Sequence, residues 1–250
     1  MKKYFLFLIA MLGGVVLSLA EMNIYVYHKD GTIEKYEASE VDSIGFIDKE
    51  NTHNGYEYVD LGLSVKWATM NVGAVNSEDY GDYFAWGEID SKDDYNFISY
   101  KWTQETSSSQ QFNKYNTNPG YGVVDGKIEL EIIDDVANAK WGGNWRMPTQ
   151  KEFEELCNTD NCIWSIYVVL EKEFYKVTSK INGNSILFPI AGYKSFNAIY
   201  SKDYDGNYWS KTLYKTAPDE AVKLRLSSNN HAYISEEHRV YGLSVRPVLP

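Results

Sequence analysis

The sequence predicts an α+β fold, in which two short helices accompany many short antiparallel strands. An Asp-Gly pair at 30–31 and an Asn-Gly pair at 182–183 each stand between stretches rich in β-branched and aromatic residues, a pattern typical of tight β-hairpins. Thr149 and Glu152 have the spacing of a helix capping box. Further short strands follow, separated by turn-forming pairs, and two helices among many strands indicate an α+β domain.

The N-terminal residues have the three parts of a secretory signal peptide. Lys2 and Lys3 precede an uncharged apolar run over 4–17, and Ser18 and Ala20 are the small residues of a cleavage site after Ala20. The run is near the lower length limit for spanning a bilayer, and no basic stop-transfer cluster follows it, so we expect cleavage and no membrane insertion afterwards. We therefore expect an exported protein, located in the periplasm, at the cell surface or outside the cell.

The composition argues against nucleic acid as a partner. The chain carries 35 acidic and 24 basic residues, for a formal net charge of −11, and loss of Lys2 and Lys3 would make it −13. No basic patch interrupts this acidic field, which repels phosphate backbones and anionic lipid surfaces. The 21 tyrosines and 7 tryptophans supply rigid rings with polar tips, which suit both core packing and recognition surfaces.

A small N-terminal β module is expected after the signal peptide. The Asp-Gly pair marks a hairpin over 23–36, and the apolar stretch 41–47 adds a third strand to this meander. A polar linker over 49–55 follows. The predicted organisation is a signal peptide over 1–20, the β module over 21–50 and a main domain over 56–250.

The main domain begins with a half-buried strand over 56–67, followed by loop and short strand over 71–88. A short helix over 136–140 follows two aspartates and ends at a Gly-Gly pair. The second helix starts after Thr149, with Pro148 just outside it. Further strands are predicted over 163–169, 175–179, 185–189, 208–213, 222–226 and 242–248, and an exposed low-complexity loop over 106–111.

Several motifs stand in a recognisable order. They are Tyr-Val-Asp-Leu-Gly-Leu at 58–63, Lys-Trp-Ala at 66–68, Asn-Val-Gly-Ala at 71–74, Tyr-Gly-Asp-Tyr-Phe-Ala-Trp-Gly-Glu at 80–88, Trp-Gly-Gly-Asn-Trp-Arg-Met-Pro-Thr at 141–149 and Gly-Leu-Ser-Val-Arg-Pro-Val at 242–248. Together they resemble the Fibrobacter succinogenes major paralogous domain family of exported bacterial proteins. The resemblance covers about residues 56–250.

That resemblance implies a C-type-lectin-like fold, the broad fold of formylglycine-generating enzymes. It places Arg146, Pro148 and Thr149 at the start of a helix and Arg246 in the closing strand, as structural residues. It also implies that the first and last strands of the domain pair. Apart from the resemblance, Trp209 is expected to be a core residue. The hairpin together with the stretch 41–46 resembles a short N-terminal module of Bacteroidetes surface proteins.

The reactive residues are few and scattered. Cys157 and Cys162 permit one disulfide across a short loop, or stay as two free thiols. Formylglycine-generating enzymes bind copper with a cysteine pair that lies later in the chain, shortly before the closing strand, so an oxidase activity of that type is the least favoured alternative. The four histidines have no metal-ligand spacing, and we expect no enzyme, no cofactor and no metal site.

Calcium is the metal to weigh most closely, because many C-type lectins hold sugars through it. Asp203, Asp205 and Asn207 alternate in a turn-like segment and offer hard oxygen ligands. Tyr208 stands where an EF-hand loop needs glycine, and no glutamate follows at the twelfth position. A solvated acidic turn is the favoured interpretation.

An aromatic surface over 193–241 is the predicted recognition face. Aromatic rings with polar neighbours suit contact with a glycan or a surface protein, which makes a non-catalytic binding module the leading hypothesis. The candidate contact residues are Tyr193, Phe196, Tyr200, Tyr204, Tyr214 and Tyr233. Alternatives are a core role for part of these aromatics, a hypervariable display segment, and a structural subunit of a pilus or surface layer that assembles through the N-terminal hairpin.

Overall fold

The computed structural model divides the chain into two compact units, Met1–Phe46 and Ile47–Pro250. The described residues are 23–27, 32–37, 51–104, 111–169, 171–227 and 231–250. Four predicted features lie wholly or mostly outside them: the signal peptide, the third strand over 41–47, the start of the linker and the loop over 106–111.

The first unit contains a β-hairpin. Strands β1 (Asn23–Tyr27) and β2 (Ile33–Glu37) are antiparallel, with Tyr27 opposite Ile33. The antiparallel pairing is the one expected on either side of the Asp-Gly pair. Tyr25, Tyr27 and Ile33 are exposed, so the hairpin carries apolar side chains on its surface.

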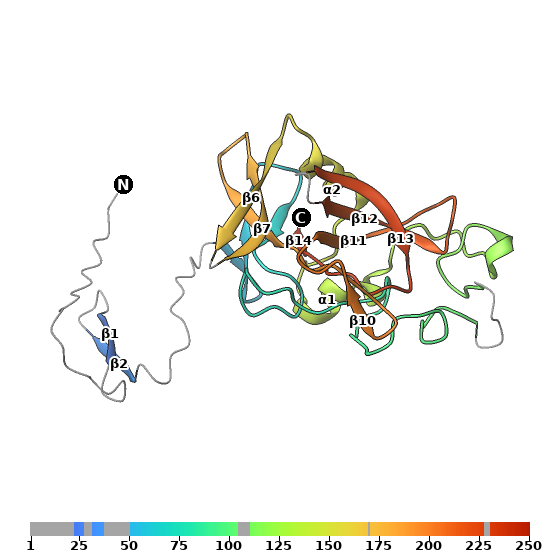
Figure 1. Cartoon of the computed structure of the whole chain (residues 1–250), viewed down its shortest axis with the longest axis horizontal. Coiled ribbons are helices and arrows are strands. Elements are labelled where there is room, and N and C mark those ends of the chain that lie inside the picture. Colours follow the sequence, from blue (N-terminus) through green and yellow to red (C-terminus); the bar gives the residue numbers. More distant parts are fainter. Residues whose placement is uncertain (1–22, 28–31, 38–50, 105–110, 170, 228–230) are drawn as a thin grey trace. The chain divides into compact units, whose positions relative to one another are not determined.

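The second unit is a strand-rich α+β domain with two α-helices (Figure 1). All pairings between its named strands are antiparallel, which gives the predicted fold class. Its sheets have the strand orders β14-β5-β4-β3, β6-β7-β8, β11-β12-β13 and β10-β9. The strands are β3 (Thr52–His53), β4 (Tyr56–Val59), β5 (Lys66–Ala68), β6 (Cys162–Val169), β7 (Lys172–Ser179), β8 (Ser185–Pro189), β9 (Tyr193–Ser195), β10 (Ala198–Tyr200), β11 (Asp205–Leu213), β12 (Glu220–Ser227), β13 (His231–His238) and β14 (Val248–Leu249).

Both predicted helices are present, and the second has the predicted N-cap. Asp135 caps α1 (Val136–Trp141) by accepting a hydrogen bond from the Asn138 amide. Thr149 caps α2 (Gln150–Cys157), and Glu152 returns the bond to complete the capping box. Among the described residues, no helix is long and apolar enough to cross a bilayer.

Helix α2 packs against one face of the β11-β12-β13 sheet. Phe153 and Leu156 of α2 lie in one apolar cluster with Tyr208 and Leu224, which belong to neighbouring strands of that sheet. Because side chains alternate across a strand, Asn207, Lys223 and other odd-numbered neighbours occupy the opposite face. This second face supports the candidate site described below.

Residues 239–249, here called the closing segment, connect nearly every part of the unit. Its backbone makes paired hydrogen bonds with Lys194, Phe84 and Arg146, and single bonds with Val72, Ala68 and Trp209. Only its end, β14, forms a regular strand, so the strand predicted over 242–248 is wrong over most of its length. The segment touches a different neighbour every one or two residues and therefore cannot follow one ladder.

Two buried arginines fix the closing segment. Arg246 is fully buried; its Nε donates to Asn71 Oδ1 at 2.8 Å, one Nη donates to the Ala68 carbonyl at 3.0 Å, and the guanidinium lies 4.6 Å from the Phe188 ring centroid. Burial lowers the pKa of Arg246 to about 10, so it stays charged at neutral pH. Arg239 is also fully buried and donates to Tyr100 Oη and to three backbone carbonyls.

The other residues of the predicted structural motif also lie in or beside the core. Arg146 pairs with both carboxylate oxygens of Glu152, and its backbone bridges to Val248. Trp209 is fully buried and donates from Nε1 to the Phe84 carbonyl at 2.9 Å. The Pro148 carbonyl accepts from the Lys211 amide at 2.7 Å, which ties the start of α2 to β11.

Four details of the predicted strand pattern need correction. The strand predicted over 56–67 is two antiparallel strands, β4 and β5, separated by a turn with a buried Leu61. The predicted linker contains β3, because its Asn-Gly pair makes a turn that pairs Thr52–His53 with β4. The last strand pairs with Lys66 and Trp67 of β5, so the expected pairing of the first and last strands holds for the end of the strand predicted over 56–67 and not for β4. Strands β9, β10 and β13 were not predicted.

Replacement of Arg246 by lysine should destabilise the protein by about 3 kcal/mol. A lysine cannot bond Asn71 and the Ala68 carbonyl while stacking on Phe188, and unmade buried hydrogen bonds are costly. The matched control is Arg225→Lys, since Arg225 is 40% exposed in a surface ion pair and should lose less than about 1 kcal/mol. Urea unfolding would give the free energy of unfolding of both variants. An equal decrease in the two variants would contradict the assigned role of Arg246.

Candidate functional site

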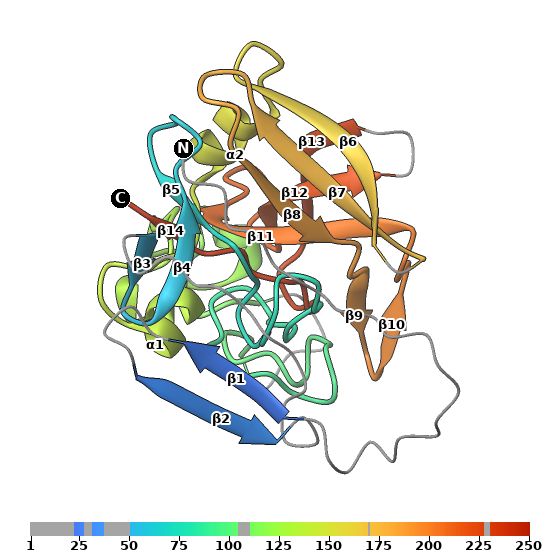
Figure 2. The same cartoon turned by 90° about the vertical axis from the view of Figure 1, so that its left-hand side faces the viewer.

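The β9-β10 hairpin holds two tyrosines in register on one side. Tyr193 and Tyr200 are opposite each other across the two strands, and their rings stack with centroids 5.6 Å apart. Two hydrogen bonds join Lys194 to Gly242, and two join Phe196 to Tyr95. The hairpin, which stands below β11 in Figure 2, is therefore fastened at both of its ends.

Five rings continue from this hairpin in a single row, here called the aromatic row. Its members in order are Tyr200, Tyr193, Tyr241, His238 and Phe97, with successive ring centroids 5.6–6.0 Å apart. All five are exposed or half-buried, and Tyr200 at the end is 46% exposed. The row draws on β9, β10, the end of β13, the closing segment and the loop after Tyr95, so it exists only in the folded chain.

The structure brings together most of the predicted contact residues, but not all. Tyr193 and Tyr200 lie in the row, and Phe196 is exposed at the hairpin turn. Tyr204 and Tyr233 are exposed at the end of the β11-β12-β13 sheet that carries Asp205 and its partner Ser227.

Tyr214 lies at the other end of the sheet from Tyr204. It follows the opposite end of the nine-residue strand β11, and at about 3.3 Å per residue that is roughly 30 Å from Tyr204. Tyr208 and Trp209, the aromatics weighed for a core role, are fully buried, whereas Tyr241 is half-buried. Tyr214 therefore lies far from Tyr204 but at the same end of the sheet as His238, because its backbone amide donates to Glu220, the residue opposite His238. Its place on the recognition face stays a prediction.

Paired charges lie beside the row on the second face of the sheet. Lys223 is buried and donates to Asn207 Oδ1 at 2.8 Å and to Glu237 Oε2 at 2.9 Å, and burial lowers its pKa. Arg225 pairs with Asp205 at 2.9 Å. Burial and then the charge of Glu237 raise the pKa of Tyr193, so its hydroxyl stays protonated at neutral pH. Each of these cations has its own anion, which leaves the row as a surface of rings and hydroxyls.

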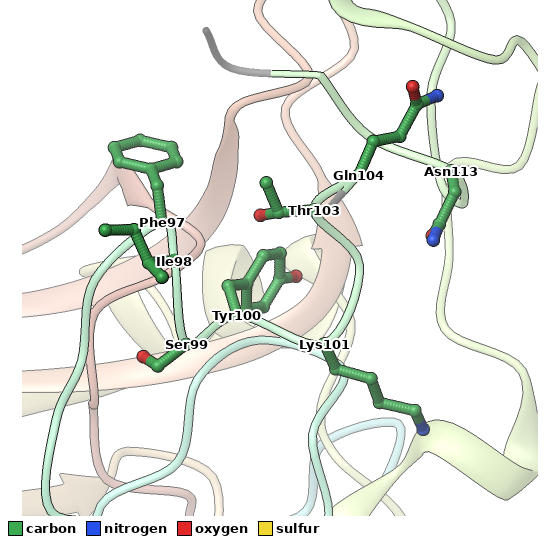
Figure 3. Close-up of a pocket in the computed structure, with 8 residues that line it drawn as sticks. All are labelled: Phe97, Ile98, Ser99, Tyr100, Lys101, Thr103, Gln104 and Asn113. Carbon is green, nitrogen blue, oxygen red and sulfur yellow. The ribbon is translucent and has the colours of Figure 1, made fainter. Parts of the chain in front are cut away.

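Phe97 connects the row to an open pocket of about 480 Å³. Figure 3 shows Phe97, Ile98 and Ser99 on one side of the pocket and Gln104 and Asn113 on the other, with Tyr100 and Thr103 between them. The Tyr100 ring is held rigidly, because its hydroxyl donates to the Trp86 carbonyl at 2.6 Å and accepts from Arg239 at 2.8 Å.

The side-chain oxygens of Asp203, Asp205 and Asn207 do not converge on one point, because each accepts a hydrogen bond from a different residue. Asp203 accepts a hydrogen bond from the Tyr80 hydroxyl, while Asp205 accepts from Arg225. The Asn207 oxygen accepts from Lys223. No group of three or more His, Cys, Asp or Glu side chains suited to a metal ion occurs in the part of the chain that the structure describes.

The two cysteines flank the turn between α2 and β6. Both are free thiols, with Cys162 buried and Cys157 half-buried. Burial raises the pKa of Cys157 to about 12 and that of Cys162 to about 11. Thiols with such high pKa values hold their protons at neutral pH, and a protonated thiol is a poor nucleophile and a poor metal ligand.

Phe97, His238 and the pocket are the parts of the site that the sequence analysis missed. His238 was weighed only for metal-ligand spacing, whereas it ends β13 and lies between Tyr241 and Phe97. Phe97 lies in a polar stretch with no periodicity. The only available signal was the combined aromatic content of the segment 80–103, which was read as loop.

Comparison with known proteins returned no match: neither a family model, nor a curated protein, nor a solved structure matches this chain.

The cysteines should react slowly with thiol reagents in the folded protein. At about pH 8 their raised pKa values leave few thiolates, so alkylation by iodoacetamide should be at least about 100-fold slower than in urea. Mass spectrometry of timed samples would give both rates. If the native protein were labelled as fast as the protein in urea, the thiols would not be inert, and a reactive cysteine pair would again be a candidate.

Proposed function

We propose that this chain is an exported, non-catalytic binding module that contacts its ligand through the aromatic row. The observation that carries the proposal is the row itself, five adjoining rings that are all at least partly open to solvent. Rings with exposed edges and polar tips are the groups that recognition surfaces use most. A glycan is the favoured ligand, and a surface protein is the competing outcome of the tests below.

The scaffold is proposed to be the C-type-lectin-like fold of the Fibrobacter succinogenes major paralogous domain family. Support comes from the position of the shared motifs. Arg146, Pro148 and Thr149 lie directly before α2, and Arg246 lies in a closing segment that returns to β5. An exported location rests on the signal peptide expected over 1–20.

A binding role is favoured over catalysis by the chemistry of the described side chains. The raised pKa values of the cysteines keep both thiols protonated at neutral pH. Glu237 and Asp205, the acidic groups beside the row, form ion pairs. The buried arginines donate hydrogen bonds to backbone carbonyls. General acid–base catalysis needs a titrating group within reach of an open site. The row offers three tyrosine hydroxyls, whose ordinary pKa lies far above neutral pH, and a single imidazole, His238, which is edge-on to its two neighbouring rings in the row with its Nδ1 3.5 Å from Asp219 Oδ2.

The mixed polar and aromatic character of the surface favours a glycan over a protein as the ligand. The rings of the row are exposed or half-buried and lie beside paired charges such as Arg225 and Asp205, whereas a protein contact usually has a buried apolar centre. An acidic protein also suits an uncharged ligand better than an anionic one.

Replacement of Tyr200 by alanine should lower the affinity for the recognised glycan at least about tenfold, as expected for an aromatic hot spot. Tyr167→Ala is the matched control, because Tyr167 is 44% exposed on β6 in a different sheet. A glycan array followed by calorimetry would measure both, with urea unfolding to verify the fold. Equal affinities for the two variants, or a Tyr200→Ala protein that no longer folds, would contradict the proposal.

A structural subunit is the second candidate, because the hairpin of the first unit has exposed apolar side chains. Tyr25, Tyr27 and Ile33 are all at least half exposed, and an isolated two-stranded hairpin is marginally stable in water. Such a hairpin suits assembly with another chain.

Size-exclusion chromatography with and without residues 21–50 separates the two candidates. A binding module should elute as a monomer in both forms, with unchanged glycan affinity. Larger species that disappear on deletion would favour the structural subunit over the binding module.

A further inference from the structure

We propose that the pocket in Figure 3 is a subsite for one uncharged sugar residue of a longer glycan that lies along the aromatic row. This inference rests on the proposed function. It adds that the ligand is uncharged and that the glycan ends at the Phe97 end of the row. The pocket volume of about 480 Å³ lies within the range of small-molecule sites.

The pocket has one apolar wall and one amide wall. Phe97 and the 96% exposed Ile98 offer apolar contact to the carbon face of a sugar. Across from them, the side-chain amides of Gln104 and Asn113 form no hydrogen bond with any described residue. An amide both donates and accepts, so two open amides match the hydroxyl groups of a sugar.

Thr103 adds a polar group that has no partner in the protein. Its Oγ1 is buried and, within the described residues, makes no hydrogen bond. A buried hydroxyl without a partner is unfavourable, so a rotation of the Thr103 side chain that exposes Oγ1 to a ligand hydroxyl would gain a hydrogen bond. In Figure 3 the Thr103 oxygen points toward the side of the pocket formed by Phe97 and Ile98.

The charges around the pocket are already paired, which favours an uncharged ligand. Lys101 is the one charged residue of the lining, and its Nζ lies 3.2 Å from Asp134 and 4.3 Å from the Trp102 ring centroid. Arg239 lies behind the Tyr100 ring and donates to carbonyl oxygens on its far side. An anionic sugar would find no unpaired cation in this lining.

Continuity with the row favours a glycan of several units over a single sugar. Phe97 belongs to both features: its ring lies 6.0 Å from His238 in the row and forms part of the pocket wall. Each step along the row is close to the length of one hexose unit, so a linear glycan could place successive sugars along it. Its last residue would then enter the pocket.

The test is a calorimetric titration of the full chain with neutral oligosaccharides of increasing length, chosen from the strongest responses on an array that also contains uronic-acid glycans. Wild type should prefer neutral glycans, and its affinity should rise with length until the pocket is filled. The affinity of the double variant Gln104→Ala/Asn113→Ala should be at least about tenfold lower than that of wild type for the longest ligand. For the shortest ligand, its affinity should change little. Asn51→Ala, an exposed amide beside β3, is the control.

The outcomes separate the two levels of the proposal. Binding that Tyr200→Ala weakens but the pocket variant leaves unchanged at every length would overturn the subsite and leave the binding function standing. A preference for uronic-acid glycans would overturn the uncharged ligand class. Failure of wild type to bind any glycan on the array would overturn the proposed glycan function and the subsite together.

Discussion

The closing segment is the constraint on which the rest of the second unit depends. It is almost entirely buried, and its backbone bonds join it to β5, to the loop before α2, to β11, and to the loops at Val72 and Phe84. Arg239 and Arg246 strengthen these links from within the core without a carboxylate among their hydrogen-bond partners, through carbonyl, amide and hydroxyl oxygens and aromatic rings. A buried guanidinium tolerates this arrangement because its planar fork reaches several acceptors at once and stacks on rings.

The same segment positions the aromatic row. Gly242 makes the two hydrogen bonds to Lys194 in β9, and Tyr241 beside it supplies the middle ring of the row. A side chain at Gly242 would collide with the Tyr95 ring, since a Cβ there would lie 2.6 Å from its nearest atom. Gly192, with φ of 67°, has the same kind of role, because a Cβ there would strike the Tyr200 carbonyl. The aromatic row is thus supported by the core of the domain and not by a flexible loop.

Features specified by neighbouring residues were predictable from the sequence, and those specified by distant contacts were not. The capping box at Thr149, the cap at Asp135 and the hairpin at the second Asn-Gly pair depend on residues within a few positions, and all three are present. The irregular path of the closing segment and the place of Phe97 beside His238 depend on partners that are distant in the chain, such as Phe84 for Leu243. Tyr193 and Tyr200 were found by composition alone, and composition also selected Tyr214, which lies at the other end of β11 from Tyr204. Strand β13 was missed because its polar and charged outer face, from Tyr233 to Glu237, obscures the alternation with Ala232 and Ile234.

Native-state hydrogen exchange tests the central claim, that the closing segment is the rigid support of the row. If the claim holds, the bonded amides of Gly242, Leu243 and Val248 exchange only through global unfolding, with a free energy equal to that from urea unfolding. The amide of Lys194 should follow them, because its bond to Gly242 is the link between support and row. Exchange of these amides through local opening, at a free energy well below that of global unfolding, would contradict the account.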